Sequence, residues 1–123
     1  MPPQEQGEPR GTISRVTRLR ARPGRQEAFR PIFRAVMKMY ETYQSFVGAS
    51  LFVNQPANRA VVLSWWTDDT EQRIAGEEAI RFVESVHAAD VDVLSVENFA
   101  VAENWPPHSS ELPTEAAEAD LWI

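Results

Sequence analysis

Cysteine is missing from this chain of 123 residues, and histidine occurs only twice. Without cysteine the chain has no disulfide framework, no thiolate nucleophile and no zinc-thiolate site. The two histidines, His87 and His108, are far apart in the sequence and form no His-x-x-x-His pair, so no convincing set of metal ligands is present. These absences predict a protein that uses no metal, and a reducing, cytoplasmic setting is the default expectation.

Long apolar runs and glycine-rich phosphate motifs are also missing. No stretch approaches the roughly 18 to 20 consecutive apolar residues that cross a bilayer. The first residues, MPPQEQGEPRG, are polar rather than basic and then apolar as in a secretory signal. No glycine pattern typical of dinucleotide or phosphate binding occurs. We therefore expect no membrane partner and no metal, flavin or nicotinamide cofactor.

Charges of both signs are present but unevenly distributed. Residues 1–60 hold ten Arg or Lys and four acidic residues, whereas residues 61–123 hold two and fourteen. The basic string comprises Arg15, Arg18, Arg20, Arg22, Arg25, Arg30 and Arg34. Such a string can bind a phosphate backbone, but no nucleic-acid recognition motif accompanies it. We expect it to pair with acidic surface of the monomer or dimer, and we expect no nucleic acid as a partner.

The residue patterns predict six elements in the order βαββαβ around a single core, for which a hydrophobic content of 43% suffices. Alternation and β-branched residues predict the strands, and apolar residues at steps of three and four predict the helices. The predicted strands are 12–21, 46–54, 59–67 and 91–102, and the predicted helices run from about 25 to 44 and from about 68 to 89.

Two residues bear on the course of these helices. Pro31 would cost a hydrogen bond inside a helix, so either the first turn is irregular or the regular helix starts near Pro31. In the second helix, Asp68 or Asp69 acts as the N-cap, and Gly76 predicts a break.

This element order is that of the α+β ferredoxin-like fold, a four-stranded antiparallel sheet with both helices packed on one face. In the third strand both alternating sets contain large apolar residues, with Leu63 and Trp65 on one face and Val62 and Trp66 on the other. Neither face can therefore be left in water. We predict a homodimer in which a second copy covers the second face.

The chain divides into three parts by composition. Residues 1–11 form a polar extension, residues 12–103 form the domain, and residues 104–123 form a proline-rich acidic tail. Such a tail is typical of disorder. Its apolar residues Trp105 and Leu121-Trp122-Ile123 instead favour a tail that docks, for example on the partner subunit.

Three local features carry a family resemblance. They are Arg22-Pro23-Gly24 before a long helix, Phe46-Val47-Gly48-Ala49-Ser50 opening the second strand, and Trp65-Trp66-Thr67-Asp68 closing the third. With them, residues 12–103 resemble the antibiotic biosynthesis monooxygenase-like family of dimeric α+β barrels. The resemblance implies two sheets meeting across a twofold axis and a small pocket between helices and sheet in each subunit. Members of that family include oxygenases that convert polycyclic phenols to quinones without metal or flavin, haem-degrading enzymes and many proteins of unknown role.

The two adjacent tryptophans are the first candidate site residues. Neighbours on a strand point to opposite faces, so one of Trp65 and Trp66 should face the helices and pocket and the other the dimer core. Trp66 matches the family's tryptophan better, because it stands two residues before the acidic start of a helix. It is either a flat wall that stacks on an aromatic substrate or a core residue.

Four further residues complete the candidate site. Tyr40 and Tyr43 carry hydroxyls that could bind or orient a phenolic substrate, or they are amphipathic boundary residues. His87 could accept a proton near neutral pH, or it is structural, and Arg81 could assist with charge. These residues predict a cofactor-independent monooxygenase acting on a flat aromatic or phenolic compound. The alternative is a non-catalytic dimer of the same fold that binds a small molecule or serves as an interaction module.

Overall fold

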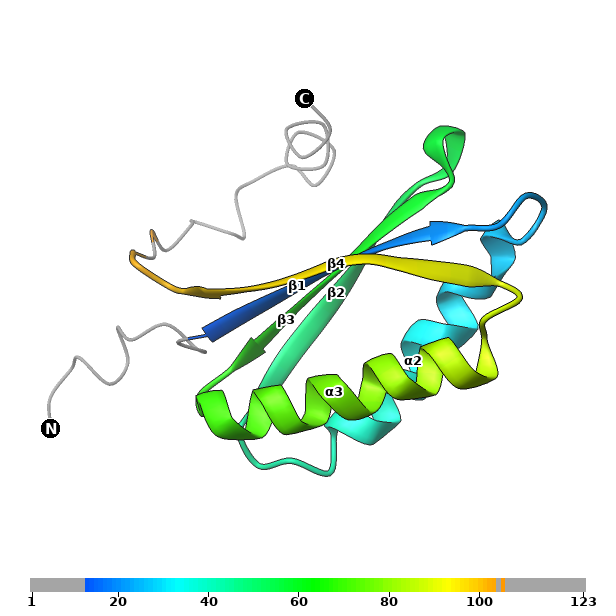
Figure 1. The fold of residues 1–123 in the computed structure, drawn as a ribbon. Helices are drawn as coiled ribbons and strands as arrows, with labels where there is room; N and C mark the ends of the chain where they lie inside the picture. Colours follow the sequence, from blue (N-terminus) through cyan, green and yellow to red (C-terminus); the bar gives the residue numbers. More distant parts are fainter. Residues whose placement is uncertain (1–12, 104, 106–123) are drawn as a thin grey trace, which may run out of the picture.

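The computed structural model describes residues 13–103 and 105, and its elements follow the predicted order βαββαβ (Figure 1). The strands are β1 (Ile13–Ala21), β2 (Phe46–Asn54), β3 (Arg59–Trp66) and β4 (Val91–Ala100), and the helices are α2 (Phe29–Tyr40) and α3 (Asp69–Val86). Short 3-10 turns, η1 (Gln26–Ala28) and η2 (Gln55–Ala57), precede α2 and join β2 to β3. Among the described helices, none is long and apolar enough to span a membrane.

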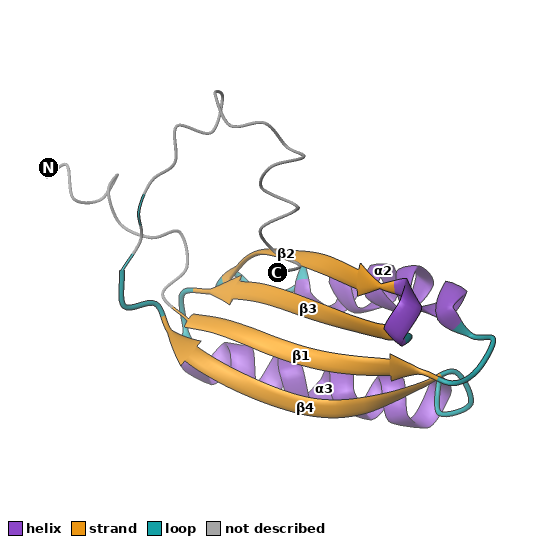
Figure 2. Ribbon diagram, turned by 90° about the horizontal axis from the view of Figure 1, so that it is seen from above, coloured by secondary structure: helices purple, strands orange, loops and turns teal. Residues whose placement is uncertain are grey.

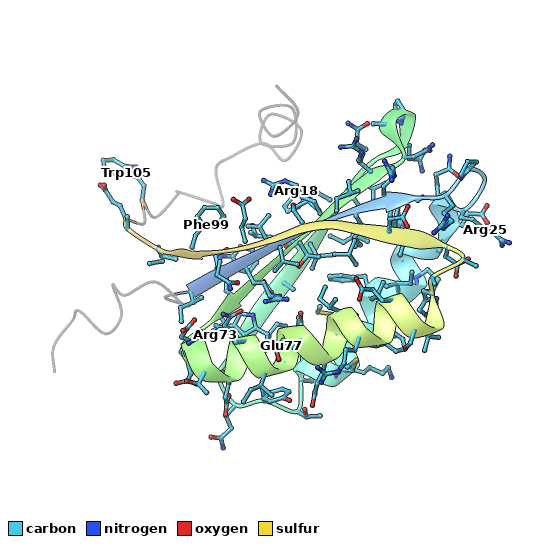
Figure 3. All side chains as sticks on the ribbon, in the orientation of Figure 1. Arg18, Arg25, Arg73, Glu77, Phe99 and Trp105 are labelled. Atoms are coloured by element: carbon cyan, nitrogen blue, oxygen red, sulfur yellow. The ribbon has the colours of Figure 1, made fainter. Side chains whose placement is uncertain are left out.

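The four strands form one antiparallel sheet in the order β2-β3-β1-β4. Both helices cover the same face of this sheet, as the two perpendicular views show (Figures 1 and 2). The predicted ferredoxin-like α+β fold is therefore confirmed. We call the uncovered side the open face; Arg18 and Phe99 lie on it, away from the helices (Figure 3). The polar extension and the tail, apart from the exposed Trp105, lie outside the described residues, and so does the expected docking of the tail.

Helix α2 begins and ends where local chemistry dictates. Pro31 is its third residue, within the first turn, where a backbone N–H has no partner inside the helix and its loss costs nothing. The predicted helix reached residue 44, but α2 ends at Tyr40. There the Thr42 hydroxyl donates to the Met39 carbonyl at 2.8 Å, and turns carry the chain on to β2. Side-chain bonds of this kind compete with the helical pattern.

Helix α3 runs without a break, so the interruption predicted at Gly76 is wrong. Glycine only weakens a helix, by about 1 kcal/mol relative to alanine, and here it provides space. A Cβ at Gly76 would overlap the guanidinium of Arg15, which lies against the helix at this point. The first turn is capped as predicted, because the Asp68 carboxylate accepts a hydrogen bond from the backbone N–H of Glu71 at 2.8 Å.

Four arginines of the basic string pair with acids that follow α3 or lie on β4. The pairs are Arg18–Glu97, Arg20–Asp92, Arg22–Asp92 and Arg25–Asp90, at 2.7 to 3.8 Å. Because β4 is the neighbour of β1, part of the basic excess early in the sequence is offset by acids that follow it much later. Exposed pairs of this kind add little stability. They do confirm, for these four residues, the predicted pairing with acidic surface of the monomer.

The cap of α3 yields a prediction about stability. We expect Asp68→Ala to lower the free energy of unfolding by about 1 kcal/mol, because a backbone N–H of the first turn loses its acceptor. Urea unfolding followed by circular dichroism measures this change. The exposed neighbour Thr70 provides the control, since Thr70→Ala removes no cap, and equal losses in the two variants would contradict the role of Asp68.

Candidate functional site

A small apolar cavity lies between the two helices and the sheet. Its lining includes Phe33, Val36, Ala79 and Val83 from the helices and Thr17 from β1. The volume is about 30 Å³, room for about one or two water molecules. A flat aromatic ligand can therefore enter only if side chains of α2 and α3 move apart. Thr17 and Tyr40 are the lining residues that carry polar groups.

An aromatic cluster adjoins this cavity where α2 ends and β3 meets α3. The Tyr40 ring lies 4.8 Å from that of Trp66 in an edge-on arrangement, and Phe46 and Tyr43 lie 5.1 and 6.3 Å from the same indole, measured between ring centroids. Trp66 is 0% exposed, and its indole N–H donates to the Ser64 hydroxyl at 2.9 Å. Tyr40 is the member of the cluster that reaches the cavity, and Trp66 supports it from behind.

The two adjacent tryptophans point to opposite faces, as predicted. Trp66 shares its face with the buried Ser64 and Ala60, under the helices. Trp65 lies on the open face, where it pairs across the sheet with Ser14 and is half-buried. Trp66 therefore belongs to the helix side and Trp65 to the side that no element of the described chain covers.

Both tyrosines carry hydroxyls that resist ionisation. Burial raises the pKa of Tyr40, although the nearby positive charge of Arg15 and a hydrogen bond from its side chain partly offset this effect. The Tyr43 hydroxyl donates to the Glu78 carboxylate at 2.9 Å, and this hydrogen bond raises the pKa of Tyr43. Near neutral pH both side chains are therefore hydrogen-bond donors and not bases.

The turn that carries Tyr43 is attached to the first turn of α3. The Glu71 carboxylate accepts hydrogen bonds from the hydroxyl and the backbone N–H of Ser45, at 2.6 and 3.1 Å. The Ser45 carbonyl in turn accepts from the backbone N–H of Thr67, just after β3. These contacts hold Tyr43 beside Trp66.

Arg81 and His87 lie apart from this cluster. Arg81 is exposed on α3, and neither residue lines the cavity. His87 directly follows α3; its Nδ1 lies 3.2 Å from a carboxylate oxygen of Asp90. The eighteen residues of α3 span about 27 Å and separate His87 from Trp66. The structure thus brings together Tyr40, Tyr43 and Trp66, and it places Arg81 and His87 elsewhere.

Sequence reasoning missed a group of buried polar residues beside the cluster. Arg15 is only 5% exposed, and its guanidinium donates to the side-chain amide oxygen (Oε1) of the fully buried Gln72 at 3.5 Å. Two signals pointed to it. Gly76 inside a helix indicates that another group approaches the helix backbone closely. Arg15 lies an even number of positions from Leu19 and Ala21 on β1, so its side chain points to the same, helix-covered face.

Other hollows and ligand sets have less bearing on this site. Within the described residues, no three His, Cys, Asp or Glu side chains are grouped so that they could hold a metal ion. A larger hollow of about 260 Å³ lies beside Phe52, Arg18 and Arg59. It opens on the open face and does not communicate with Trp66 or Tyr40, which lie across the sheet.

The raised pKa of Tyr40 predicts a change of stability in alkali. Its contribution is complete below about pH 10 and is lost as the pH rises through the higher pKa of the folded state, because the unfolded chain ionises first. We expect the free energy of unfolding to fall above about pH 10, and to fall less steeply in Tyr40→Phe. Urea unfolding at a series of alkaline pH values measures both slopes, and equal slopes would refute a raised pKa at Tyr40. Tyr43 remains in both proteins and serves as an internal control.

Known proteins resemble this chain in structure but not closely in sequence. No protein-family model matches it, and no curated protein matches it significantly. A protein of unknown function from Nitrosomonas europaea superposes with a TM-score of 0.65 at 12% identity, covering 79% of this chain and 95% of that one. SnoaB, a cofactor-independent oxygenase from Streptomyces nogalater, superposes with a TM-score of 0.58 at 19% identity, covering 77% and 97%.

A third solved structure carries the family name. It is a protein from Bordetella bronchiseptica provisionally named an antibiotic biosynthesis monooxygenase, with a TM-score of 0.61 at 14% identity over 76% of this chain and 99% of that one. At these identities the likeness concerns the fold. The resemblance predicted from the sequence is confirmed at that level: the chain has the ferredoxin-like α+β fold of antibiotic biosynthesis monooxygenase-like proteins.

Proposed function

We propose that this protein is a cofactor-independent monooxygenase that oxidises a flat aromatic or phenolic small molecule. The observation that carries the proposal is the position of Tyr40, which joins the cavity between helices and sheet to the cluster around Trp66. The likeness in fold to SnoaB, itself a cofactor-independent oxygenase, supports the same assignment.

The reaction requires little of the protein beyond binding and positioning. An electron-rich phenol can reduce oxygen itself: one oxygen atom enters the ring as a carbonyl, the other leaves as water with the two hydrogens lost by the phenol, and a quinone results. The site would exclude water and align the ring. The protonated Tyr40 hydroxyl would donate a hydrogen bond to the substrate oxygen, and Tyr43 would support the turn beside Trp66.

A second candidate function rests on the same cavity. Its lining is apolar except for Thr17 and Tyr40, which suits retention of a small apolar molecule as well as its conversion. In this alternative the protein is a non-catalytic binding or interaction module. Because the two functions share one pocket, turnover distinguishes them and binding alone does not.

Oxygen uptake tests the proposed activity. With chelator-treated protein and hydroxylated anthracene-type compounds, we expect uptake without added metal, flavin or nicotinamide. Ala79→Val inserts carbon atoms into the cavity, so the rate should fall by roughly tenfold or more, whereas Ala88→Val, outside the cavity, should not change it. Unfolding curves must show that Ala79→Val stays folded, since overpacking costs about 1 to 3 kcal/mol.

Three results decide between the candidates. Uptake that appears only after metal or flavin is restored would overturn the cofactor-independent mechanism. Equal rates in Ala79→Val and Ala88→Val would move the site away from the cavity. Tight binding with no uptake across a broad phenol panel would favour the binding module.

We also propose that two copies pair through their open faces. The open face carries apolar side chains that water would otherwise contact: Val16, Phe52, Val61, Leu63, Trp65 and Phe99, the last of them 48% exposed. Their breadth across all four strands fits another sheet better than a small ligand. Pairing would also cover the hollow beside Phe52.

Light scattering tests the dimer. At low micromolar concentration we expect about twice 13.9 kDa. Leu63→Lys places a charge in the middle of the open face and should yield monomers, because an unpaired charge cannot be buried between the sheets. Ile74→Lys, an equal change at an exposed apolar residue of α3, should leave the dimer intact. A wild-type monomer at this concentration would contradict the proposal.

A further inference from the structure

Arg15 carries a buried positive charge that the described chain does not neutralise. It lies on the helix-covered face, near the start of the central strand β1. Its Nε is buried without a hydrogen-bond acceptor, and one Nη donates to the side-chain oxygen of Gln72 at the long distance of 3.5 Å. The Tyr40 hydroxyl is a neutral partner for the same guanidinium, since a hydrogen bond from Arg15 offsets part of the rise in the pKa of Tyr40. Among the described residues, no carboxylate lies within 4.0 Å of the guanidinium.

The acids nearest in sequence to the contact point are otherwise occupied or exposed. Gly76 is followed by Glu77, which is exposed, and by Glu78, which accepts the hydrogen bond from Tyr43. Both Arg73 and Glu77 lie along the N-terminal half of α3 (Figure 3), and Arg73 already pairs with Asp69 at 2.9 Å. The guanidinium is therefore left with an unsatisfied Nε and with no anion among the described residues.

A buried charge without a partner is costly, and proteins rarely keep one that has no use. The fold makes room for this charge at Gly76, where the guanidinium of Arg15 occupies the space that a side chain on α3 would otherwise fill. A glycine inside a helix and an unpaired buried arginine are each unfavourable alone. Their combination indicates a preformed receptor for an anion.

Arg15 does not itself line the cavity, but two residues close to it do. Thr17 lies two residues after Arg15 on the same face of the sheet, and it lines the cavity. Tyr40 also lines the cavity, and it is close enough to Arg15 for the positive charge to offset part of the rise in its pKa. On the neighbouring strand, Asn98 pairs with Arg15 and Val96 with Thr17. Both are exposed, Val96 by 36%, so the margin of the site along β4 is open to solvent.

We propose that Arg15 binds an anionic oxygen of the ligand, so that the pocket selects flat aromatic compounds bearing an ionised phenol or a carboxylate. The guanidinium presents several N–H groups in one plane, which matches such oxygens. The apolar cavity would hold the ring, and the exposed Asn98, which pairs with Arg15 across the strands, would offer an amide beside it. This inference extends the proposed function by naming the substrate class, but it concerns binding and can hold where turnover fails.

Equilibrium binding without oxygen turnover tests the inference. The probes are 2-naphthoate and its neutral isostere 2-naphthamide, with 4-nitrophenolate and its neutral methyl ether 4-nitroanisole for the phenolic source. Titration calorimetry measures the affinity of the wild-type protein for each probe, and thermal-shift assays measure the change in melting temperature; both use the protein in its own oligomeric state. We expect both anions to bind more tightly than their neutral partners and to raise the melting temperature more.

Arg15→Met should reduce this preference for the anion by roughly ten- to a hundredfold, the worth of hydrogen bonds to a charged group. The control is Arg34→Met, the same change at an exposed residue of α2, which should keep the preference. Arg15→Lys should retain a part of it, since the charge remains but the planar fork is lost. Without ligand, Arg15→Met should be as stable as the wild type or more stable, because the variant no longer buries an unpaired charge.

Gly76→Ala supplies an independent variant that keeps Arg15 itself. The added methyl group displaces the guanidinium, so the anion preference should fall while the charge of the chain is unchanged. Equal affinities for 2-naphthoate and 2-naphthamide in the wild type would overturn the inference, as would an unchanged preference in folded Arg15→Met. If the protein prefers only one of the two anions over its neutral partner, that result identifies the anionic group of the ligand as a carboxylate or as a phenolate. Oxygen uptake plays no part in these outcomes, so failure of the monooxygenase proposal remains distinguishable.

Discussion

A sheet has two faces, and this chain supplies helices for one of them. The rest of the structure depends on that constraint. Because strand residues alternate between faces, each strand had to provide two different sets of side chains, one for the helices and one for the open face. Trp65 and Trp66 show the result within a dipeptide, since one is half-buried on the open face and the other lies at the centre of the core.

The helix-covered face holds an enclosed aromatic cluster and, next to it, a buried arginine whose charge is not neutralised. The cluster around Trp66 is enclosed, with the indole N–H satisfied by Ser64, so it cannot move without loss of packing and of that hydrogen bond. Arg15 next to it has the opposite character, because its donors are only partly used. The anion proposed for this site would meet the cluster through Tyr40, the member that reaches the cavity. Because the volume of the cavity is only about 30 Å³, binding also requires side chains of α2 and α3 to move apart.

The arginines of β1 lie on opposite faces of the sheet and have different partners. Arg18 and Arg20, on the open face, pair with acids of β4 and remain largely exposed, so their charge is balanced locally. Arg15 points to the other side and meets α3 at Gly76 instead of a carboxylate. Arginines close together in the sequence thus lie in different environments, because successive side chains of a strand point to opposite faces of the sheet.

The order of elements, the antiparallel sheet, a cap at Asp68 or Asp69 and the opposite directions of the two tryptophans followed from the sequence alone, since they depend on periodicity and on contacts between near neighbours. The structure decided the cap in favour of Asp68. The end of α2 and the continuity of α3 did not, because a local competition at Thr42 and a remote side chain at Gly76 decided them. The candidate site divides in the same way. Tyr40, Tyr43 and Trp66 could be named from their patterns. That Arg15 joins them while His87 lies at the far end of α3 was decided by tertiary structure, because strand register and helix placement bring together residues that the sequence keeps more than fifty positions apart.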